Sequence, residues 1–350
     1  MSGPTEKSLL SALSKVMDPE LGKDLVTLGM IQKLDVDGSV VSFDLVLTTP
    51  ACPMKRHLED ACRNAVMGVR GVTEAKIDVT SNVHEHRAGG DRVNLIPTVK
   101  NAVAVASGKG GVGKSTVAVN LAVALAQSGA STGLMDCDVY GPSIPLMMGV
   151  NARPQARKGK LIPLEKYGVR MMSLGFMLEL DTPVIWRGPM VMKALQQLLE
   201  NVDWGELDYL VMDMPPGTGD AQLTVTQSVP LTGAVVVSTP QDVALLDAAR
   251  AVAMFRKCGV PVLGIVENMS YFLCPHCGER TDIFSHGGAA RESKRLNVPF
   301  LGEIPIDAGI PDGGDKGLPV VAGRSDSKIA EVFRAIAGTV ASGISVAYRG

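Results

Sequence analysis

Residues 102–115 read AVAVASGKGGVGKS, a short apolar run that leads through a glycine-rich loop to Lys114 and Ser115. The second half matches the pattern GxxxxGK[ST], and the residues that follow have helical composition. Glycines let backbone N–H groups converge on phosphate oxygens at the start of a helix, while Lys114 adds a positive charge and the Ser115 hydroxyl can ligate Mg²⁺. The stretch therefore predicts a strand, a phosphate-binding loop and a helix. The expected nucleotide contacts are Gly108, Lys109, Gly110, Gly111, Val112, Gly113, Lys114, Ser115 and Thr116.

From residue 100 onwards, short apolar runs alternate with amphipathic segments. The runs are TGLMD, YLVMD, AVVVS and PVLGIVEN, in chain order. Runs that are apolar throughout are typical of parallel strands buried on both faces of a sheet. We therefore expect an α/β fold, a P-loop NTPase with a mostly parallel sheet covered by helices on both faces.

Three aspartates follow the predicted strands. Asp213 ends YLVMD and precedes MPPGTGD, which fits a Walker B carboxylate near Mg²⁺ and a loop that senses the γ-phosphate. Asp136 and Asp138 follow the strand TGLMD, one βα unit after the phosphate loop. Ligands of open α/β sheets bind at this carboxyl edge, so we expect catalytic roles for Lys114, Asp138 and Asp213. Helix capping is the alternative for the aspartates.

The N-terminal region has a different pattern. Its sequence predicts a helix over 5–17, a strand over 40–47, a helix over 53–69 and a strand over 72–79. These elements predict a small α+β domain over residues 1–81, and the polar stretch 82–99 predicts a linker to a nucleotide-binding domain over 100–350. His84 and His86 in the linker are expected to be solvated.

Composition limits the class of protein. The 350 residues are 46% hydrophobic and 20% charged, with a formal net charge of −2, so there is no basic field of the kind that binds nucleic acid or anionic membranes. The N-terminus shows no signal-peptide pattern, and no run approaches about 18 uninterrupted apolar residues. Six cysteines without regular spacing do not suggest a disulfide framework. We expect a cytoplasmic protein that binds neither nucleic acid nor membrane.

Cys274 and Cys277 form a CxxC pair, whereas the other four cysteines stand alone in the sequence. A zinc site or an iron–sulfur cluster normally takes four protein ligands, so the pair is half of a metal site. Zinc, an iron–sulfur cluster and a redox dithiol are all open from the residues alone. A redox pair normally lies at a helix N-terminus, whereas FLCPHCGERT predicts a loop or knuckle. His276, between the cysteines, is expected to be no ligand.

GKGGVGKS resembles the deviant Walker A motif of MinD/ParA-like ATPases. The resemblance implies that Lys109 reaches across a dimer interface to the partner's nucleotide phosphates, which adds it to the catalytic residues. It also implies that Asp138 positions the attacking water and that Asp213 acts at the Mg²⁺ site through its water shell. Asn268 in VENMS would contact the adenine, and GEIPID, residues 302–307, would form the other wall of the adenine site.

A longer set of motifs resembles the Mrp/ApbC-type iron–sulfur carrier ATPases. These motifs are GKGGVGKS, MDCDVYGPSIP, WRGPM, DMPPGTGD, STPQDVALLDAAR, VENMSYFLCPHCG and FSHGGA. The N-terminal DPELGKDLVTLGMI and TTPACP resemble the PaaD-like domain often fused to this branch. The resemblance implies a homodimer that binds ATP and Mg²⁺, receives clusters from a donor and delivers them to apo iron–sulfur client proteins. Two facing copies of Cys274 and Cys277 would supply four thiolates to a [4Fe–4S] cluster bridging two subunits.

Two other classes share the ATPase core. If the chain were a MinD/ParA-like positioning ATPase with a structural zinc or redox CxxC, we would expect a basic amphipathic C-terminal helix that binds membrane or DNA. The C-terminal SKIAEVFRAIAGTVASGISVAYRG carries only scattered charges and predicts a packing helix. A metal-loading or reductase-activating ATPase differs from a cluster carrier only in its cargo.

Cys52 precedes Pro53 at a predicted helix start, where backbone N–H groups favour a thiolate. A lone cysteine in an intracellular domain is more often a small buried apolar residue. Both a cluster-handling role and a packing role are therefore open for Cys52.

Overall fold

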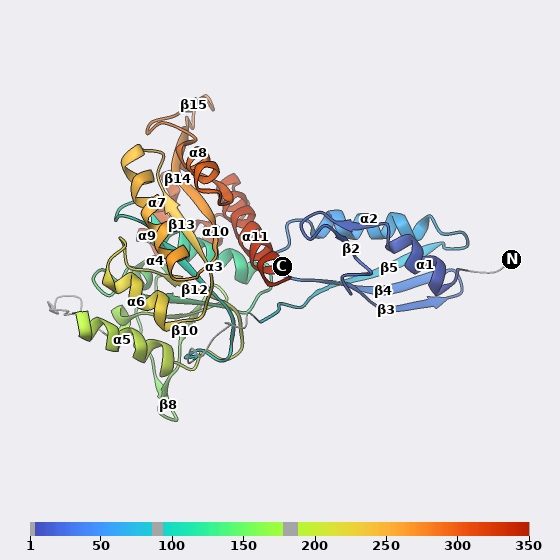
Figure 1. Cartoon of the computed structure of the whole chain (residues 1–350), viewed down its shortest axis with the longest axis horizontal. Helices are drawn as coiled ribbons and strands as arrows, with labels where there is room; N and C mark the ends of the chain where they lie inside the picture. Colours follow the sequence, from blue (N-terminus) through green and yellow to red (C-terminus); the bar gives the residue numbers. More distant parts are fainter. Residues whose placement is uncertain (1–3, 86–93, 178–187, 350) are drawn as a thin grey trace. The chain divides into compact units, whose positions relative to one another are not determined.

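The computed structural model describes residues 4–85, 94–177 and 188–349. The chain forms two compact units, Met1–His84 with Ala341–Gly350, and Glu85–Val340 (Figure 1). His86, the middle of the predicted linker, and Trp186 and Arg187 of the WRGPM motif lie outside the described residues.

The smaller unit contains a three-stranded sheet in the order β3–β4–β5. Its elements are α1 (Glu6–Leu13), β1 (Met17–Asp18), β2 (Lys23–Asp24), β3 (Ile31–Asp37), β4 (Val40–Leu47), α2 (Lys55–Met67) and β5 (Glu74–Ser81). β3 and β4 are antiparallel, and β4 and β5 are parallel. Thr5 and Ser8 form a capping box that starts α1.

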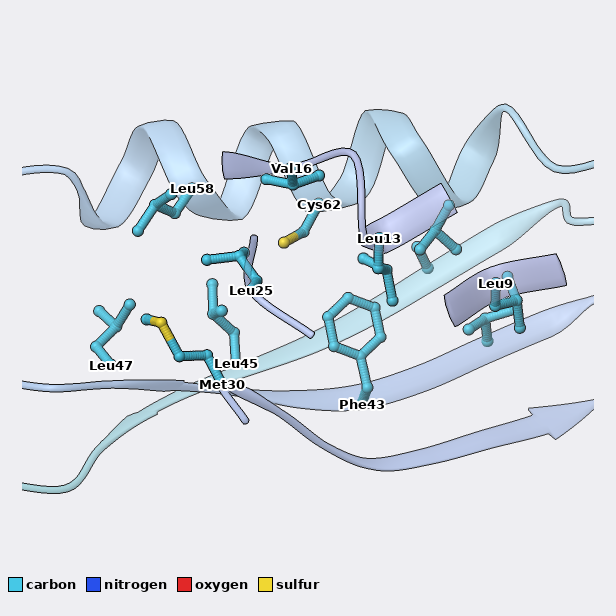
Figure 2. Packing of buried hydrophobic residues seen from close by; sticks show 13 residues of the cluster. Leu9, Leu13, Val16, Leu25, Met30, Phe43, Leu45, Leu47, Leu58 and Cys62 are labelled. Atoms are coloured by element: carbon cyan, nitrogen blue, oxygen red, sulfur yellow. The ribbon is translucent and has the colours of Figure 1, made fainter. Parts of the chain in front are cut away.

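The core of the smaller unit lies between this sheet and its helices (Figure 2). Leu58 and Cys62 of α2 point toward Phe43 and Leu45 of β4, and all four side chains are at most 2% exposed. Burial alternates along β4 because successive side chains of a strand point to opposite faces. Fully burying a side chain such as Leu or Phe contributes about 1.5–3 kcal/mol to stability. Cys62 lies among these side chains and is a packing residue.

The larger unit is built on a nine-stranded sheet in the order β10–β11–β7–β12–β6–β13–β14–β15, with β16 also paired to β14. β10 and β15 are antiparallel to their neighbours, and the other strand pairs are parallel. The strands are β6 (Val99–Ala106), β7 (Thr132–Asp136), β10 (Leu164–Lys166), β11 (Val169–Met172), β12 (Leu207–Asp213), β13 (Leu231–Ser238), β14 (Val262–Leu273), β15 (Arg280–Thr281) and β16 (Phe300–Ile306). The expected α/β class with a mostly parallel sheet is confirmed.

Helices α3, α7 and α8 pack against the strands of this sheet. The helical elements are α3 (Lys114–Gln127), α4 (Ile144–Met147), η1 (Leu174–Phe176), α5 (Gly188–Glu200), α6 (Asp220–Ser228), α7 (Asp242–Lys257), α8 (Gly288–Leu296), α9 (Gly309–Asp315), α10 (Val320–Gly323) and α11 (Lys328–Arg349). A separate hairpin pairs β8 (Ala156–Arg157) with β9 (Lys160–Leu161). Because β7, β12 and β6 are parallel neighbours, the loops after them meet at one edge of the sheet.

One helix among the described residues is long and apolar enough to cross a membrane, Lys328–Ala347 within α11. More than half of this stretch is buried in the structure. A buried apolar helix is what the core of a folded protein requires, so this segment behaves as the predicted packing helix.

Candidate functional site

The phosphate loop joins β6 to α3. Gly111 and Gly113 have φ values of 81° and 83°, a left-handed conformation that costs a residue with a Cβ about 1–2 kcal/mol. A Cβ on Gly108 would lie 2.1 Å from the backbone oxygen of Asp247 in α7, so the loop packs directly against that helix. Of the predicted contact residues, Gly110 and Gly111 are exposed, Gly108, Lys109, Gly113, Ser115 and Thr116 are half-buried, and Val112 and Lys114 are buried.

Lys114 begins α3 and lies between two aspartates. Its Nζ is 2.7 Å from Oδ1 of Asp213 and 3.8 Å from Oδ2 of Asp138. The same nitrogen donates a hydrogen bond of 3.2 Å to the Ser115 hydroxyl. The side chain of Lys114 is 7% exposed and that of Asp213 is 0% exposed. The structure therefore gathers Ser115, Asp138 and Asp213 around the buried ammonium group of Lys114, from the start of α3, the loop after β7 and the end of β12.

The donor set at this point fits Mg²⁺. The second carboxylate oxygen of Asp213, Oδ2, is buried and accepts no hydrogen bond from the described residues. Buried carboxylate oxygens normally have a partner, so this oxygen is available to a ligand or to its bound water. Mg²⁺ takes oxygen ligands from one or two carboxylates, waters and substrate phosphates. Asp213 and the Ser115 hydroxyl can supply the protein share of such a site.

The aspartates of the site have raised pKa values. Burial raises the pKa of Asp213, and the charge of Lys114 opposes this shift. Burial also raises the pKa of Asp138, again against the effect of Lys114. The pKa of Asp136 rises to about 7, because burial and the neighbouring Asp213 both disfavour its ionised form. Such perturbed carboxyl groups in a cluster are typical of functional sites.

Asp136 holds the loop that carries Asp138. Its Oδ1 accepts the backbone N–H of Asp138 at 3.1 Å, and its Oδ2 accepts the backbone N–H of Ile144 at 3.3 Å and the Ser173 hydroxyl at 2.9 Å. One carboxylate thus fixes both ends of the loop 137–143. The sequence correctly placed Asp136 at the carboxyl edge of the sheet. No local pattern indicated that its carboxylate holds the loop 137–143 or contacts Ser173.

Asn268 lies against the phosphate loop. Its Nδ2 donates to the backbone oxygen of Val112 at 2.9 Å, and its side chain is buried. A Cβ on Gly113 would lie 2.1 Å from this nitrogen. The residue that was expected beside the adenine therefore contacts the loop itself. Residues 302–307, the expected second wall, lie largely in β16, where Ile304 pairs with Asn268.

Cys274 and Cys277 lie in the turn between β14 and β15, which are antiparallel. The N–H of Cys274 donates to the Glu279 oxygen at 2.9 Å, and the N–H of Gly278 donates to the Cys274 oxygen at 2.8 Å. The backbone N–H groups of Cys277 and His276 lower the pKa of the Cys274 thiol, which favours the thiolate that binds metals. The pair lies in a knuckle rather than at a helix N-terminus, as predicted.

Cys274 and Cys277 are the two candidate metal ligands of this knuckle. Among the residues that the structure describes, no third His, Cys, Asp or Glu completes a site with the pair. A group of three does occur elsewhere, at Glu267, His286 and Glu303, whose nearest ligand atoms lie within 4.8 Å of one another. These side chains already bond within the protein: Glu267 accepts three hydrogen bonds, and Nε2 of His286 lies 3.0 Å from Oε1 of Glu303.

Of the two roles left open for Cys52, the structure favours packing. Helix α2 begins at Lys55 with Met54 as its N-cap, so Cys52 lies before the first turn. Burial raises the pKa of the Cys52 thiol to about 11, and the carboxylates of Glu20 and Asp18 add to this shift. At neutral pH the side chain is a thiol that packs against the core of the smaller unit.

Comparison with known families matches two parts of the chain. Residues 98–341 match the family described as NUBPL iron-transfer P-loop NTPase, and residues 6–79 match the family described as iron-sulfur cluster assembly protein. The iron-sulfur cluster carrier protein of Synechocystis sp. is 50% identical over 349 residues, covering 98% of this chain and 99% of that protein. The iron-sulfur cluster carrier protein of Escherichia coli is 41% identical over 332 residues, covering 94% and 90%.

Solved structures share the fold of the larger unit. A nucleotide-binding protein of Archaeoglobus fulgidus in complex with ADP is 41% identical and covers 63% of this chain and 88% of its own, with a TM-score of 0.57. The cell division ATPase MinD of Pyrococcus furiosus is 23% identical and covers 69% and 98%, with a TM-score of 0.51. The second likeness shows the fold alone.

Proposed function

Since the chain belongs to the family of iron-transfer P-loop NTPases, we propose that it binds iron–sulfur clusters and transfers them to apo-proteins under the control of ATP. One observation carries this proposal: a single chain holds both a full set of nucleotide residues around Lys114 and a cysteine knuckle with half of a ligand set. The carrier relatives, similar over nearly the whole chain, support the choice of cargo.

The nucleotide site works through the loop 108–116. Its N–H groups and the start of α3 bind the β- and γ-phosphates of ATP, as helix N-termini do. Lys114 exchanges its pairing with Asp213 for the phosphates, which leaves the Asp213 carboxylate to hold the water shell of Mg²⁺ beside the Ser115 hydroxyl. The Asp213 carboxylate and the Ser115 hydroxyl would hold Mg²⁺, which would supply positive charge against the phosphates.

Hydrolysis needs an oriented water molecule. Asp138 lies 3.8 Å from Lys114 on a loop that Asp136 fixes, so its carboxylate is set to orient a water toward the γ-phosphate. The water oxygen bonds to phosphorus as the bond to the leaving ADP oxygen breaks, and the water proton leaves with the phosphate. Half-buried Lys109 acts on the nucleotide of a second copy, so full activity requires a homodimer.

The cluster is the cargo, and two copies of the knuckle hold it. Cys274 and Cys277 of one chain and the same residues of its partner supply the four thiolates of a bridging [4Fe–4S] cluster. The lowered pKa of Cys274 favours the deprotonated form that binds metals. Cys277 is exposed and Cys274 is half-buried, so the cluster lies at the surface, where a client protein can reach it.

The remaining parts of the proposal concern its setting. The protein acts in the cytoplasm as a homodimer, receives clusters from a donor protein and passes them to apo iron–sulfur proteins. We propose functional domains over 1–81 and 100–350, joined by a linker over 82–99, and we propose that the first of them docks donor or client. Neither nucleic acid nor membrane is a partner, in keeping with the net charge of −2.

Anaerobic cluster transfer tests the proposal. The protein is reconstituted with iron and sulfide, and the transfer of its cluster to an apo-ferredoxin is followed by circular dichroism with ATP, with ADP and without nucleotide. The wild type should transfer its cluster at a rate that depends on the nucleotide, and Cys274→Ser/Cys277→Ser should hold no transferable cluster. Cys258→Ser is the matched control, because Cys258 is also half-buried but stands at the end of α7.

Two results would contradict the proposal. Equal transfer by the double variant and the wild type would show that the knuckle does not hold the cargo. A nucleotide-independent rate in the wild type would leave a cluster protein that ATP does not control.

A further inference from the structure

Strand β14 carries a group of buried polar side chains in its second half. Glu267, Asn268 and Ser270 are at most 6% exposed, and they follow the buried apolar residues 263–266. Buried polar groups are retained where they have partners. The partners here belong to the phosphate loop and to the segment that follows the cysteine knuckle, so one strand contacts both halves of the proposed mechanism.

The first contact ties β14 to the phosphate loop. Asn268 donates to the backbone oxygen of Val112 at 2.9 Å. The next residue of the loop, Gly113, has a φ of 83° and leaves no room for a Cβ, which would lie 2.1 Å from the Asn268 nitrogen. A change in the position of Val112 must therefore stretch this bond or move the strand.

The second contact ties β14 to the chain beyond the knuckle. Glu267 accepts the backbone N–H groups of Gly287 at 3.1 Å and Ala289 at 2.6 Å, at the start of α8. It also accepts the Ser270 hydroxyl at 2.6 Å. The segment returning from the knuckle is thus held to the same strand residue that precedes Asn268.

A further set of contacts holds the knuckle's returning strand. Arg280 lies over the ring of Tyr271 at 4.1 Å, 3.0 Å from Asp282 and 3.8 Å from Glu303. Glu303 in turn contacts His286 at 3.0 Å. Arg280 at the base of the knuckle therefore contacts both β14, through Tyr271, and β16, through Glu303.

Between the phosphate-loop contact and the knuckle, β14 is irregular. Met269 has a φ of 55°, and the register of β14 against β16 shifts between Asn268 and Phe272. A non-glycine residue in the left-handed region is uncommon, and such strained positions cluster at functional sites. The Ser270–Glu267 bond closes the irregular stretch. The regular pairing of β14 with β16 is thus interrupted between the phosphate-loop contact and the knuckle.

We propose that Asn268 is a positioning residue that couples the phosphate loop to the cysteine knuckle through β14. Nucleotide bound to the loop moves Val112, and the hydrogen bond from Asn268 transmits this movement to β14. The irregular stretch around Met269 then changes the position of Cys274. The inference rests on the proposed function, because it assigns a route by which ATP alters cluster transfer. It gives Asn268 a part that does not depend on contact with the adenine.

The test compares cluster transfer with saturating ATP and without nucleotide, as a ratio of rates, in anaerobic full-length protein. Coupling between two sites commonly amounts to a change of about 5-fold or more. The wild-type ratio should depart from one by that factor, and Asn268→Ala should bring it to within about 2-fold of one. Iron content should stay at the wild-type level in this variant, which shows that the cysteine knuckle still binds the cluster.

Two further variants keep the test decisive. Asn101→Ala removes another buried amide, which donates to the Asp208 oxygen at 3.2 Å near the opposite end of β6 from the phosphate loop, and it should leave the ratio unchanged. Met269→Gly relieves the backbone strain, so it should fold, and it should also bring the ratio toward one. Saturating ATP separates coupling from nucleotide affinity.

The outcomes separate this inference from the proposed function. If the wild-type rate of cluster transfer does not depend on ATP, the proposed regulation by ATP is wrong, and the inference is wrong with it. If the wild type responds while Asn268→Ala and Met269→Gly respond equally, the proposed function stands and the route through β14 is wrong. An effect of Asn268→Ala that disappears at saturating ATP would also overturn the inference, since it would mark a residue that only binds nucleotide.

Discussion

Replacing Lys114 with alanine removes the cation from a buried cluster of carboxylates. Its ammonium lies 2.7 Å from Asp213, whose side chain is 0% exposed, and Asp136 next to this pair is 2% exposed. Breaking a buried ion pair by removing one partner costs about 3–5 kcal/mol, because the other charge stays buried without compensation. We therefore expect Lys114→Ala to lower the free energy of unfolding of the larger unit by about 3–5 kcal/mol at pH 8.

The loss of unfolding free energy in Lys114→Ala should increase with pH. Without Lys114, the pKa of Asp213 rises further above its unfolded value than in the wild type, where burial already raises it. A carboxyl group whose folded pKa is raised stabilises the protein at low pH and loses that contribution as pH rises through the folded pKa. The difference between wild type and variant should therefore be smaller at pH 5.5 than at pH 8.

Urea unfolding followed by tryptophan fluorescence measures this difference. Both tryptophans, Trp186 and Trp204, belong to the C-terminal part of the chain, so the signal reports on the larger unit. Lys100→Ala is the matched control, since Lys100 pairs with Asp208 at 2.8 Å but its side chain is 36% exposed. Such a pair contributes about 0–1 kcal/mol.

A second variant tests the cause of the loss. Lys114→Ala/Asp213→Asn removes the buried charge with its partner and should recover most of the lost stability. Equal losses in Lys114→Ala and Lys100→Ala, or a loss that shrinks toward pH 8, would refute the account of the buried cluster.

Three further predictions concern the same elements. Gly113→Ala places a Cβ on a residue with left-handed backbone and against Asn268, so the affinity for ATP measured by calorimetry should fall about 10-fold or more. Gly159→Ala is the control: Gly159 also has a positive φ, but the space around it is open, so this variant should bind ATP like the wild type. The pKa of Asp136 is raised to about 7, so the stability of the wild type relative to Asp136→Asn should fall as pH rises from about 4 to about 7; a rise over this range in urea titrations would contradict it. Cys52, with its pKa of about 11, should react with iodoacetamide at pH 7.5 far more slowly than Cys274, as measured by mass spectrometry of the modified peptides. Equal rates would mean that the pKa of the Cys52 thiol is not raised.

Local sequence patterns predicted those parts of the site that one stretch of chain determines. The phosphate loop depends on glycines and a helix start within a few residues, and the knuckle depends on the spacing of Cys274 and Cys277. Asp138 and Asp213 followed from their place after apolar strands, because parallel strands bring their ends together.

The contacts that no single stretch contains could not be predicted in this way. Asp136 bonds Ser173 across 37 positions of sequence, and Glu267 bonds residues at the start of α8 about 20 positions later. These pairings depend on strand order and on burial, which the sequence pattern does not encode locally. The role of Cys52 was left open for the same reason: a helix-start rule favoured a thiolate, while tertiary packing half-buries the residue and raises the pKa of its thiol.

The central claim is that a half-complete knuckle becomes a cluster site only when two chains share it. The most direct test is a Mössbauer spectrum and a metal analysis of anaerobically reconstituted protein, with its assembly determined by native mass spectrometry. The account predicts a dimer with one [4Fe–4S] cluster per two chains, absent from Cys274→Ser/Cys277→Ser and present in Cys258→Ser. A full cluster bound to a single chain, or a colourless dimer with stoichiometric zinc, would contradict it.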